Sequence, residues 1–295
     1  MIPGIRKFGF RAFGVVAFGA LALCSPSPAQ EKKLTAEELV SRHLDAIGSK
    51  ESRAAVTRRV VSGPVKGVIR LAGAGVLNGG AVMLSSGSRF RYTMKFPNLE
   101  YPADEMAFDG ERADTNILAN GRRTSVGLFL TQQPLPLKEG LLGGVLSAAW
   151  ALGRIERLQP RLDYRGIRKI DGRETYSLGY RARKGSSDLK VNLYFDSATF
   201  RHLRTEYAFE IAAHLGNGPN DSTRNDETHF LLVEEFDDFR VVDGLTLPHK
   251  YKLQVEVTGS GSPVGGGRPV LMAWTLTIDQ ISHKVAVDEA VFKIR

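Results

Sequence analysis

The sequence is short of the residues and motifs that mark common catalytic and metal sites. Cys24 is the only cysteine among 295 residues, and it lies close to the N-terminus. The rest of the chain therefore has no disulfide, no thiolate metal ligand and no cysteine nucleophile. The chain also has no G-x-S-x-G elbow, no P-loop and no H-E-x-x-H pair, which excludes the usual hydrolase, nucleotide-binding and zinc-protease signatures.

The apolar run near the N-terminus, residues 12–24, is 13 residues long and too short to span a bilayer comfortably. Three basic residues precede it, and Ser27 and Ala29 follow it at the −3 and −1 positions of a cleavage site. This is the layout of a secretory signal peptide. We therefore expect residues 1–29 to be removed and residues 30–295 to form a single exported domain in a bacterial periplasm.

Cys24 has a second interpretation. The stretch "LALC" resembles a lipobox, in which the cysteine is lipidated after cleavage, although such boxes normally place Gly, Ala or Ser where this chain has Leu23. Lipidation at Cys24 would anchor the protein to a membrane. Cleavage after Ala29 would instead remove the cysteine with the signal peptide.

The net charge gives little support to a nucleic-acid partner. Cleavage after Ala29 removes Arg6, Lys7 and Arg11 and no acid, so the formal charge falls from +8 to +5. A charge of this size is mild, and an exported protein rarely meets nucleic acid. We therefore expect no nucleic-acid partner, while anionic lipid or an acidic partner stays open.

The mature chain is expected to begin with helices. Thr35 and Glu38 have the spacing of a capping box, and Gly48 lies where a C-terminal cap belongs, which predicts a helix between them. A second short helix is expected over residues 51–57. His43 lies on the apolar face of the first helix and is interpreted as a packed side chain rather than a ligand.

From about residue 58 onward the sequence is typical of antiparallel strands. β-branched, aromatic and alternating runs are broken by Gly, Asn and Asp. Three Asp-Gly pairs are typical of tight turns between such strands. These pairs are Asp109-Gly110, Asp171-Gly172 and Asp243-Gly244.

One predicted strand has a clear apolar face. Along residues 89–96 every second side chain is apolar and the others are polar or basic, so one face is buried. The apolar side chains are those of Phe90, Tyr92, Met94 and Phe96. We expect this face to form part of the floor of an apolar groove.

An apolar segment interrupts the strands at residues 134–153. Leu142, Leu146 and Trp150 are spaced as on one face of a helix, which predicts a helix over residues 141–152 that two adjacent glycines soften. This helix is either part of a packed core or a movable plug across an apolar cavity. If it is a plug, these three side chains line or fill the groove.

Together these patterns predict a mainly antiparallel β protein with a few helices, of the α+β class. Roughly ten strands form a sheet too large to stay flat, so we expect a large curled sheet or an unclosed β-barrel. Helices would cover its concave face. That face is either a packed core or a ligand cavity.

The acidic stretch from Glu234 to Asp238, with His249 beyond the next turn, is the remaining candidate for a catalytic or metal site. Successive side chains on a strand point to opposite faces, so the four acids cannot all converge. We interpret them as a solvated strand edge. We assign no catalytic residue, no metal ligand and no cofactor.

Four stretches resemble the bacterial periplasmic proteins of the outer-membrane lipoprotein-sorting type. They are "TAEELVSRHLDAIGSKES" from residue 35, "FDG" from 108, "YFDSATFRHLRTEY" from 194 and "FDDFRVVDGLTLPHKYKL" from 236. The resemblance implies an unclosed β-barrel with a concave apolar face covered by helices. It also implies that the protein holds lipoprotein acyl chains, or another hydrophobic ligand, during transit across the periplasm.

We therefore expect a periplasmic, non-enzymatic carrier or sensor of a hydrophobic ligand. Its partners would be lipid or lipoprotein acyl chains, with a membrane-bound partner protein as a further candidate. Two alternatives stay open: a protein-binding regulatory or envelope-assembly module of the same fold, and an enzyme that uses the acidic strand. The module would tolerate polar substitution of Leu142 or Leu146, whereas the enzyme would lose activity on Asp237→Asn or Asp238→Asn.

Overall fold

A computed structural model describes residues 34–70, 74–184, 188–211, 227–259 and 269–294 of the chain. The expected signal peptide, residues 1–29, and the lipidation candidate Cys24 lie outside the described residues. Within the described residues, no helix is long and apolar enough to cross a membrane.

The described chain begins with two short helices, α1 (Ala36–Ile47) and α2 (Lys50–Ala55). The Thr35 hydroxyl accepts a hydrogen bond from the Glu38 amide at 3.1 Å, which confirms the predicted cap. Helix α1 buries one face, including His43, against the rest of the protein. The packed role expected for His43 is therefore confirmed.

In the described part of the chain, 13 strands form one antiparallel sheet. The strands are β1 (Arg58–Arg70), β2 (Ala74–Ser86), β3 (Arg89–Lys95), β4 (Ala103–Phe108), β5 (Ala113–Thr115), β6 (Arg161–Ile170), β7 (Arg173–Arg181), β8 (Lys190–Asp196), β9 (His202–Ile211), β10 (Thr228–Val242), β11 (Leu245–Thr258), β12 (Val270–Thr277) and β13 (Gln280–Ser282). Their order is β5-β4-β3-β2-β1-β12-β11-β10-β9-β8-β7-β6, and β13 pairs with β1 outside this row. The sheet is not closed, and the predicted fold class is confirmed.

Two of the three predicted Asp-Gly pairs form tight two-residue turns, whereas Asp109-Gly110 lies in a longer connection, residues 109–112, between β4 and β5. Asp171 and Gly172 have positive φ values of 48° and 83°, and Asp243 and Gly244 have values of 49° and 77°. A type I′ turn needs this backbone at both central residues. Each of these two pairs therefore connects one strand to the next, which runs antiparallel to it.

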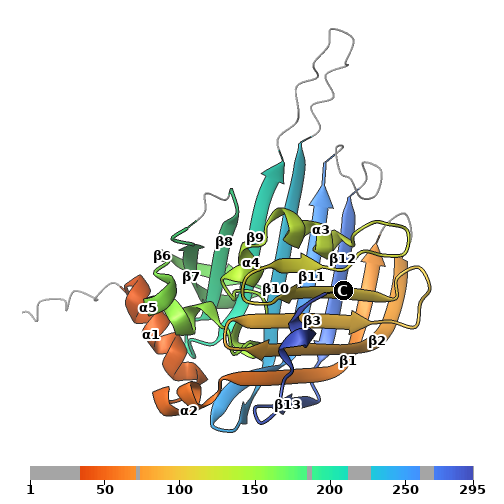
Figure 1. The fold of residues 1–295 in the computed structure, drawn as a ribbon. Helices are drawn as coiled ribbons and strands as arrows, with labels where there is room; N and C mark the ends of the chain where they lie inside the picture. The colour runs from red at the N-terminus through yellow and green to blue at the C-terminus, as the bar shows by residue number, and fades with distance from the viewer. Residues whose placement is uncertain (1–33, 71–73, 185–187, 212–226, 260–268, 295) are drawn as a thin grey trace, which may run out of the picture. The chain divides into compact units, whose positions relative to one another are not determined.

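The sheet is strongly curled, so strands β1–β3 pass in front of β10–β12 and cross them at a steep angle (Figure 1). A twisted sheet of this many strands curls because the rotation between neighbours accumulates. Along β11 and β12 alternate residues are buried, which gives the sheet one apolar face. The C-terminal 3₁₀ turn η4 (Glu289–Phe292) packs on β3.

Residues 125–158, here called the inserted segment, run between β5 and β6 and cover the concave face (Figure 1). The segment contains α3 (Ser125–Gln132), α4 (Leu135–Lys138), η1 (Gly144–Leu146), η2 (Ala151–Arg154) and α5 (Ile155–Leu158). Helices on the concave face were expected, and the structure confirms them.

The predicted helix over residues 141–152 is wrong, because glycine redirects the backbone there. Gly140, Gly143 and Gly144 have φ values of 73°, 82° and 48°. This left-handed region cannot continue a right-handed α-helix, and glycine enters it without steric cost. Two short 3₁₀ turns replace the helix. We call residues 140–152 the glycine-rich stretch.

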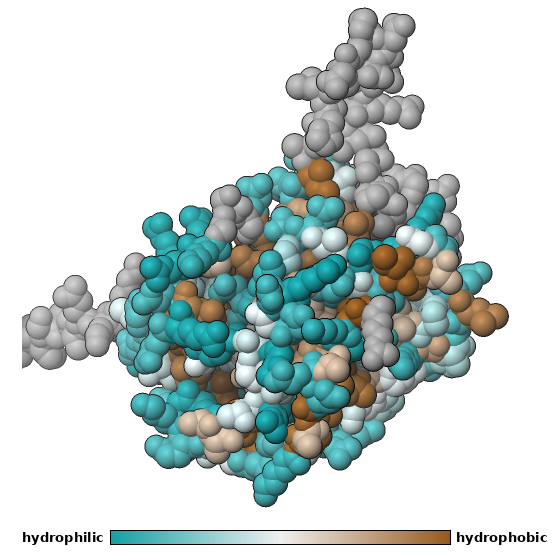
Figure 2. Space-filling view, viewed as in Figure 1, coloured by the Kyte–Doolittle hydropathy of each residue, from teal (hydrophilic) through white to brown (hydrophobic). Residues whose placement is uncertain are grey.

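One hydrophobic core lies between the concave face and the inserted segment. Figure 2 shows a mainly hydrophilic surface on the side in view, with scattered apolar side chains. The buried members of this core show that the apolar face of the sheet is covered rather than open as a groove.

Candidate functional site

The seven residues predicted to line a ligand groove lie together in the interior. All are buried members of one core cluster: Phe90, Tyr92, Met94 and Phe96 from β3 and its end, and Leu142, Leu146 and Trp150 from the glycine-rich stretch. The glycine-rich stretch lies close to β3, since a Cβ atom at Gly143 would lie 3.1 Å from the Phe90 ring. The glycine-rich stretch therefore fills the space above this part of the sheet.

The middle of the concave face holds a buried carboxyl group, that of Glu234 on β10. Its Oε1 accepts hydrogen bonds from the Gly143 amide at 2.6 Å and the Tyr251 hydroxyl at 2.8 Å. Its Oε2 accepts a third from the Tyr207 hydroxyl at 2.6 Å. Burial raises the pKa of Glu234 to about 7, against the opposing effect of these three hydrogen bonds.

This position corrects the interpretation of Glu234 as part of a solvated strand edge. Strand β10 lies between β9 and β11, so it is an interior strand of the sheet. Phe230, Leu232 and Phe236 are buried at the same two-residue spacing as Glu234. Strand alternation therefore turns this carboxyl into the core.

The other acids of this stretch do not converge on Glu234. Asp237 and Asp238 are exposed, and Asp238 forms an ion pair with Arg240 at 2.5 Å. His249 Nδ1 lies 3.2 Å from a carbonyl of its own strand. The stretch therefore presents no cluster of groups for acid–base or metal chemistry, and it gives the enzyme hypothesis no support.

A second buried carboxyl, that of Asp104 on β4, fixes the start of the inserted segment. Its Oδ1 accepts a hydrogen bond from the Thr124 hydroxyl at 2.7 Å, and the Tyr101 hydroxyl donates to its Oδ2. The Thr124 oxygen in turn accepts from the Gly127 amide at 3.0 Å and caps α3. Burial raises the pKa of Asp104 to about 7.

Two further polar groups of the sheet bind the backbone of the glycine-rich stretch. Arg59 on β1 is buried, and its Nη1 donates to the Val145 carbonyl at 2.5 Å. Ser85 Oγ on β2 accepts from the Ala148 amide at 2.9 Å. Burial lowers the pKa of Arg59 to about 10. These contacts satisfy backbone groups that a buried irregular segment otherwise leaves unpaired.

Trp150 connects the glycine-rich stretch to two buried histidines. Its Nε1 donates to His43 Nε2 at 3.1 Å, while His43 Nδ1 donates to the Phe200 carbonyl at 3.0 Å. The Trp150 ring stacks on His202, with 4.9 Å between the ring centroids. Burial lowers the pKa of His43 to about 4 and also lowers that of His202, so both rings are neutral at pH 7.

Asp104, Arg59 and Ser85, whose side chains bind the inserted segment, were not predicted from the sequence. For the two buried acids a signal was present, because each occurs in phase with the apolar face of its strand. Asp104 precedes Met106 and Phe108 at two-residue spacing. An acid in the inward phase of a strand must find hydrogen-bond donors in the core, and this requirement points to a specific site.

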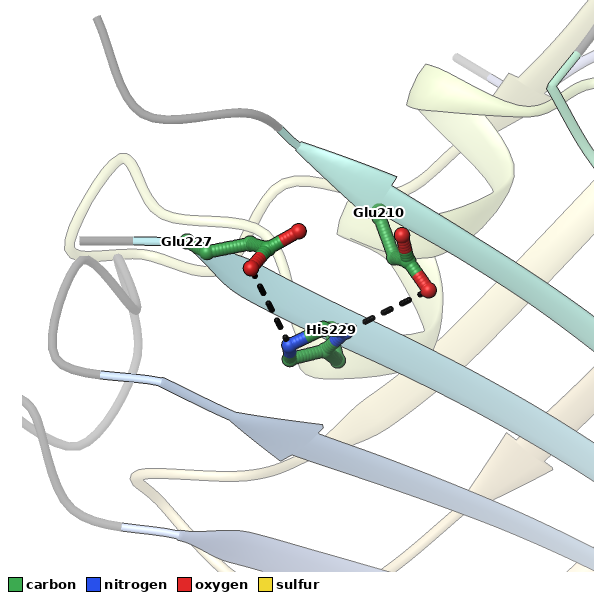
Figure 3. A group of neighbouring side chains, drawn as sticks. All are labelled: Glu210, Glu227 and His229. Atoms are coloured by element: carbon green, nitrogen blue, oxygen red, sulfur yellow. Dashed lines mark ion pairs between the residues drawn. The ribbon is translucent and has the colours of Figure 1, made fainter. Parts of the chain in front are cut away.

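A further group of titratable side chains lies at the ends of β9 and β10 and consists of Glu210, Glu227 and His229 (Figure 3). His229 Nδ1 lies 3.5 Å from Glu210, and Nε2 lies 3.8 Å from Glu227. All three side chains are exposed. Exposed pairs of this kind contribute at most about 1 kcal/mol, and this group shares no residue with the interior site.

Two surface hollows also lie apart from the predicted groove. One, of about 1030 Å³, lies between β1–β4 and residues 288–293. The other, of about 890 Å³, lies along β6–β9. None of the seven predicted residues lines either hollow. All seven are buried, so the interior is closed to solvent at these residues.

Comparisons with known proteins give fold neighbours. No protein-family description matches the sequence, and no curated protein matches it. Among solved structures, the chain is similar to a domain described as an outer membrane lipoprotein-sorting protein from Vibrio parahaemolyticus, with 12% identity, a TM-score of 0.44 and coverage of 88% of this chain and 97% of that one. It is also similar to a LolA superfamily protein from Nitrosomonas europaea, with 11% identity, a TM-score of 0.43 and coverage of 88% and 98%. A DUF1329 family protein from Desulfovibrio piger matches with 12% identity, a TM-score of 0.40 and coverage of 88% and 97%.

These solved structures include the lipoprotein-sorting type that the sequence resembles. At such identities a likeness concerns the fold alone, and TM-scores below 0.5 carry no argument about function. The function is therefore inferred from the interior of this chain.

Proposed function

We propose that this chain is a non-enzymatic carrier or sensor, exported to the periplasm, that binds the apolar part of an amphiphile in its concave interior. A lipoprotein acyl chain is one such ligand. The glycine-rich stretch occupies the interior, so binding requires this stretch to move. The observation that carries the proposal is that polar side chains of the sheet hold the stretch at several separate points.

The glycine-rich stretch is held differently from an ordinary core helix. A core helix satisfies most of its own backbone groups, whereas here three backbone groups, at Gly143, Val145 and Ala148, bond to side chains of the sheet. Fully paired buried polar groups fix one arrangement, while their net contribution to stability is modest. These hydrogen bonds therefore fix the position of the glycine-rich stretch, and their modest net energy allows other donors and acceptors to replace them.

The energies of release and of ligand binding are of similar size. Four hydrogen bonds hold the stretch: three to side chains of the sheet and one from Trp150 to His43 of α1. At about 0.5–1.5 kcal/mol each, their loss costs roughly 2–6 kcal/mol. Burial of an acyl chain recovers roughly 0.8 kcal/mol per CH₂, so about ten methylenes recover roughly 8 kcal/mol. One acyl chain can therefore replace these contacts if Leu142 and Leu146 stay packed against it.

The two tryptophans of the chain allow a direct test. Trp150 lies in the glycine-rich stretch, and Trp274 lies on β12. The variant Trp274→Phe leaves Trp150 as the only tryptophan, and it breaks no hydrogen bond to a described residue. Because Trp150 is 5% exposed in the closed structure, ligand binding should shift its emission to the red and increase its quenching by acrylamide.

Native mass spectrometry of the purified protein should show bound lipid. The variant Leu146→Ser should weaken the uptake of a fluorescent fatty acid. Its matched control, Val241→Ser, alters a side chain that is 72% exposed and should leave uptake unchanged. Protein that stays empty, together with a Trp150 signal that does not move, would contradict the proposal and favour the protein-binding alternative.

A further inference from the structure

The polar centre of the concave face, formed by Glu234, Tyr207, Tyr251 and Tyr92, has a chemistry that selects among ligands. We infer that it recognises a nitrogen-bearing head group, whose N–H, from an amide or an ammonium, donates to the Glu234 carboxyl in place of the Gly143 amide. This inference rests on the proposed function, because it names the ligand that displaces the glycine-rich stretch.

Movement of the glycine-rich stretch leaves Glu234 short of one donor. Tyr207 and Tyr251 belong to β9 and β11, so they remain at the carboxyl, whereas the Gly143 amide departs. Glu234 is fully buried, and no described cation forms an ion pair with it. A buried carboxyl that has lost one of its three donors is incompletely hydrogen-bonded, which is costly. A hydrocarbon chain leaves that cost unrelieved, while an N–H donor removes it.

Tyr92 gives an independent indication of a polar ligand. It is fully buried on β3, and its hydroxyl forms no hydrogen bond with any described residue. Its ring packs edge-on against Tyr251, with 5.8 Å between the centroids. Tyr92 therefore lies beside Tyr251, whose hydroxyl binds Glu234. An unpaired hydroxyl near the Glu234 carboxyl suits an amide ligand. The amide C=O would accept from Tyr92 while its N–H donates to Glu234.

The same centre disfavours anionic head groups. Two buried carboxyls, Glu234 and Asp104, lie on the inner face, and the titratable groups around Glu234 are the hydroxyls of Tyr92, Tyr207 and Tyr251. An ionised fatty acid or a phosphate would place another negative charge beside Glu234 and bring no donor. Amides and ammonium ions should therefore bind more tightly than carboxylates.

An isosteric pair of probes tests the inference. N-methyltetradecanamide and methyl tetradecanoate share one tail and one carbonyl, and they differ only in whether an N–H or an oxygen follows the carbonyl. In the wild-type protein, the amide should bind about 10-fold more tightly, which corresponds to about 1.4 kcal/mol. Tetradecylamine should likewise bind about 10-fold more tightly than tetradecanoate at pH 8.

Two variants assign the preference to particular side chains. Glu234→Gln keeps a carbonyl acceptor but no charge, so it should lose the preference for the amine and keep part of that for the amide. Tyr92→Phe breaks no hydrogen bond to a described residue and should weaken the amide and the ester alike. The binding of the amide and the ester by the wild-type protein tests the head-group preference even if Glu234→Gln fails to fold.

The possible outcomes separate this inference from the function on which it rests. Tighter binding of the amide supports both. Equal binding of the amide and the ester by the wild-type protein would overturn the head-group inference and leave the carrier function standing. Binding of none of the four probes would contradict the carrier function itself.

Discussion

Two of the contacts between the inserted segment and strands β9 and β10 are held in opposite ways. At one, Phe129 of α3 packs against Phe209 and Phe230, with 5.1 and 6.5 Å between the ring centroids. At the other, the Gly143 amide bonds to the carboxyl of Glu234. The first contact is apolar and carries no titratable group, whereas the second is polar and depends on one.

The difference separates a permanent attachment from a releasable one. An aromatic contact gives up its buried area when it opens, and nothing polar can replace it. A hydrogen bond to a carboxyl can be exchanged for another donor at little net cost. We therefore expect α3 to stay on the sheet while the glycine-rich stretch moves.

The aromatic contact should give the largest loss of stability when it is broken. Phe129→Ala leaves a cavity beside the stacked rings of Phe209 and Phe230, so the free energy of unfolding should fall by about 3–5 kcal/mol. The loss should be equal at pH 5 and pH 8 by urea denaturation. The control Ile167→Ala truncates a side chain that is 56% exposed and should change stability by less than about 0.5 kcal/mol. A loss of stability that differs between pH 5 and pH 8 would contradict the claim that the aromatic contact does not depend on a titratable group.

The carboxyl contact should instead depend on pH. The pKa of Glu234 rises from 4.5 to about 7 on folding, so the folded state favours the protonated carboxyl. The contribution of the Glu234 carboxyl to the free energy of unfolding is therefore fully present below pH 4.5 and is lost as the pH rises through 7. Over that window the wild type should lose about 3 kcal/mol relative to Glu234→Gln, whose amide does not titrate.

Urea denaturation of the wild type and Glu234→Gln between pH 4 and pH 8 measures this difference. The comparison cancels the titration of Asp104, His43 and His202, because both proteins contain them. A difference in stability that stays constant with pH would show that Glu234 does not distinguish this contact from the aromatic one.

Backbone strain introduced at Gly143 should have a smaller effect on stability, and it should act on the polar contact alone. The Gly143 φ of 82° disfavours any side chain, and a Cβ atom there would lie 3.0 Å from Met83 Sδ. Gly143→Ala should therefore destabilise the closed arrangement by roughly 1–2 kcal/mol. Because the stretch competes with the ligand, ligand affinity should rise about 10-fold.

Gly153→Ala is the matched control for this substitution, because a Cβ atom at Gly153 would meet nothing within 4 Å. It should change neither stability nor affinity appreciably. Thermal denaturation and titration of the Trp150 emission measure both quantities. A weaker affinity in Gly143→Ala than in Gly153→Ala would mean that the stretch assists binding rather than competes with it.

Local patterns were enough to predict much of the fold. Thr35 and Glu38 mark the first helix, and the Asp171-Gly172 and Asp243-Gly244 pairs mark two turns, because each signal lies within four residues. The prediction of a helix over residues 141–152 was wrong for a physical reason. The spacing of its leucines fits a helix, but the left-handed backbone at its glycines does not.

The polar centre of the site could not be assembled from the sequence. Glu234 is separated from Tyr251 by 17 residues, from Tyr207 by 27 and from Gly143 by 91. Only the register of β9, β10 and β11 and the path of the inserted segment bring these groups together. What the sequence does show is that Glu234 occupies an inward position of its strand, which marks it as unusual without naming its partners.

Amide-resolved hydrogen exchange with and without N-methyltetradecanamide shows whether the glycine-rich stretch moves when ligand binds. Bound ligand should speed exchange at the Gly143 and Ala148 amides, whose bonds to Glu234 and Ser85 would be released. It should leave exchange unchanged at the Leu128 amide, which bonds within α3. Binding that leaves the Gly143 and Ala148 amides equally or more protected would contradict the movement of the glycine-rich stretch.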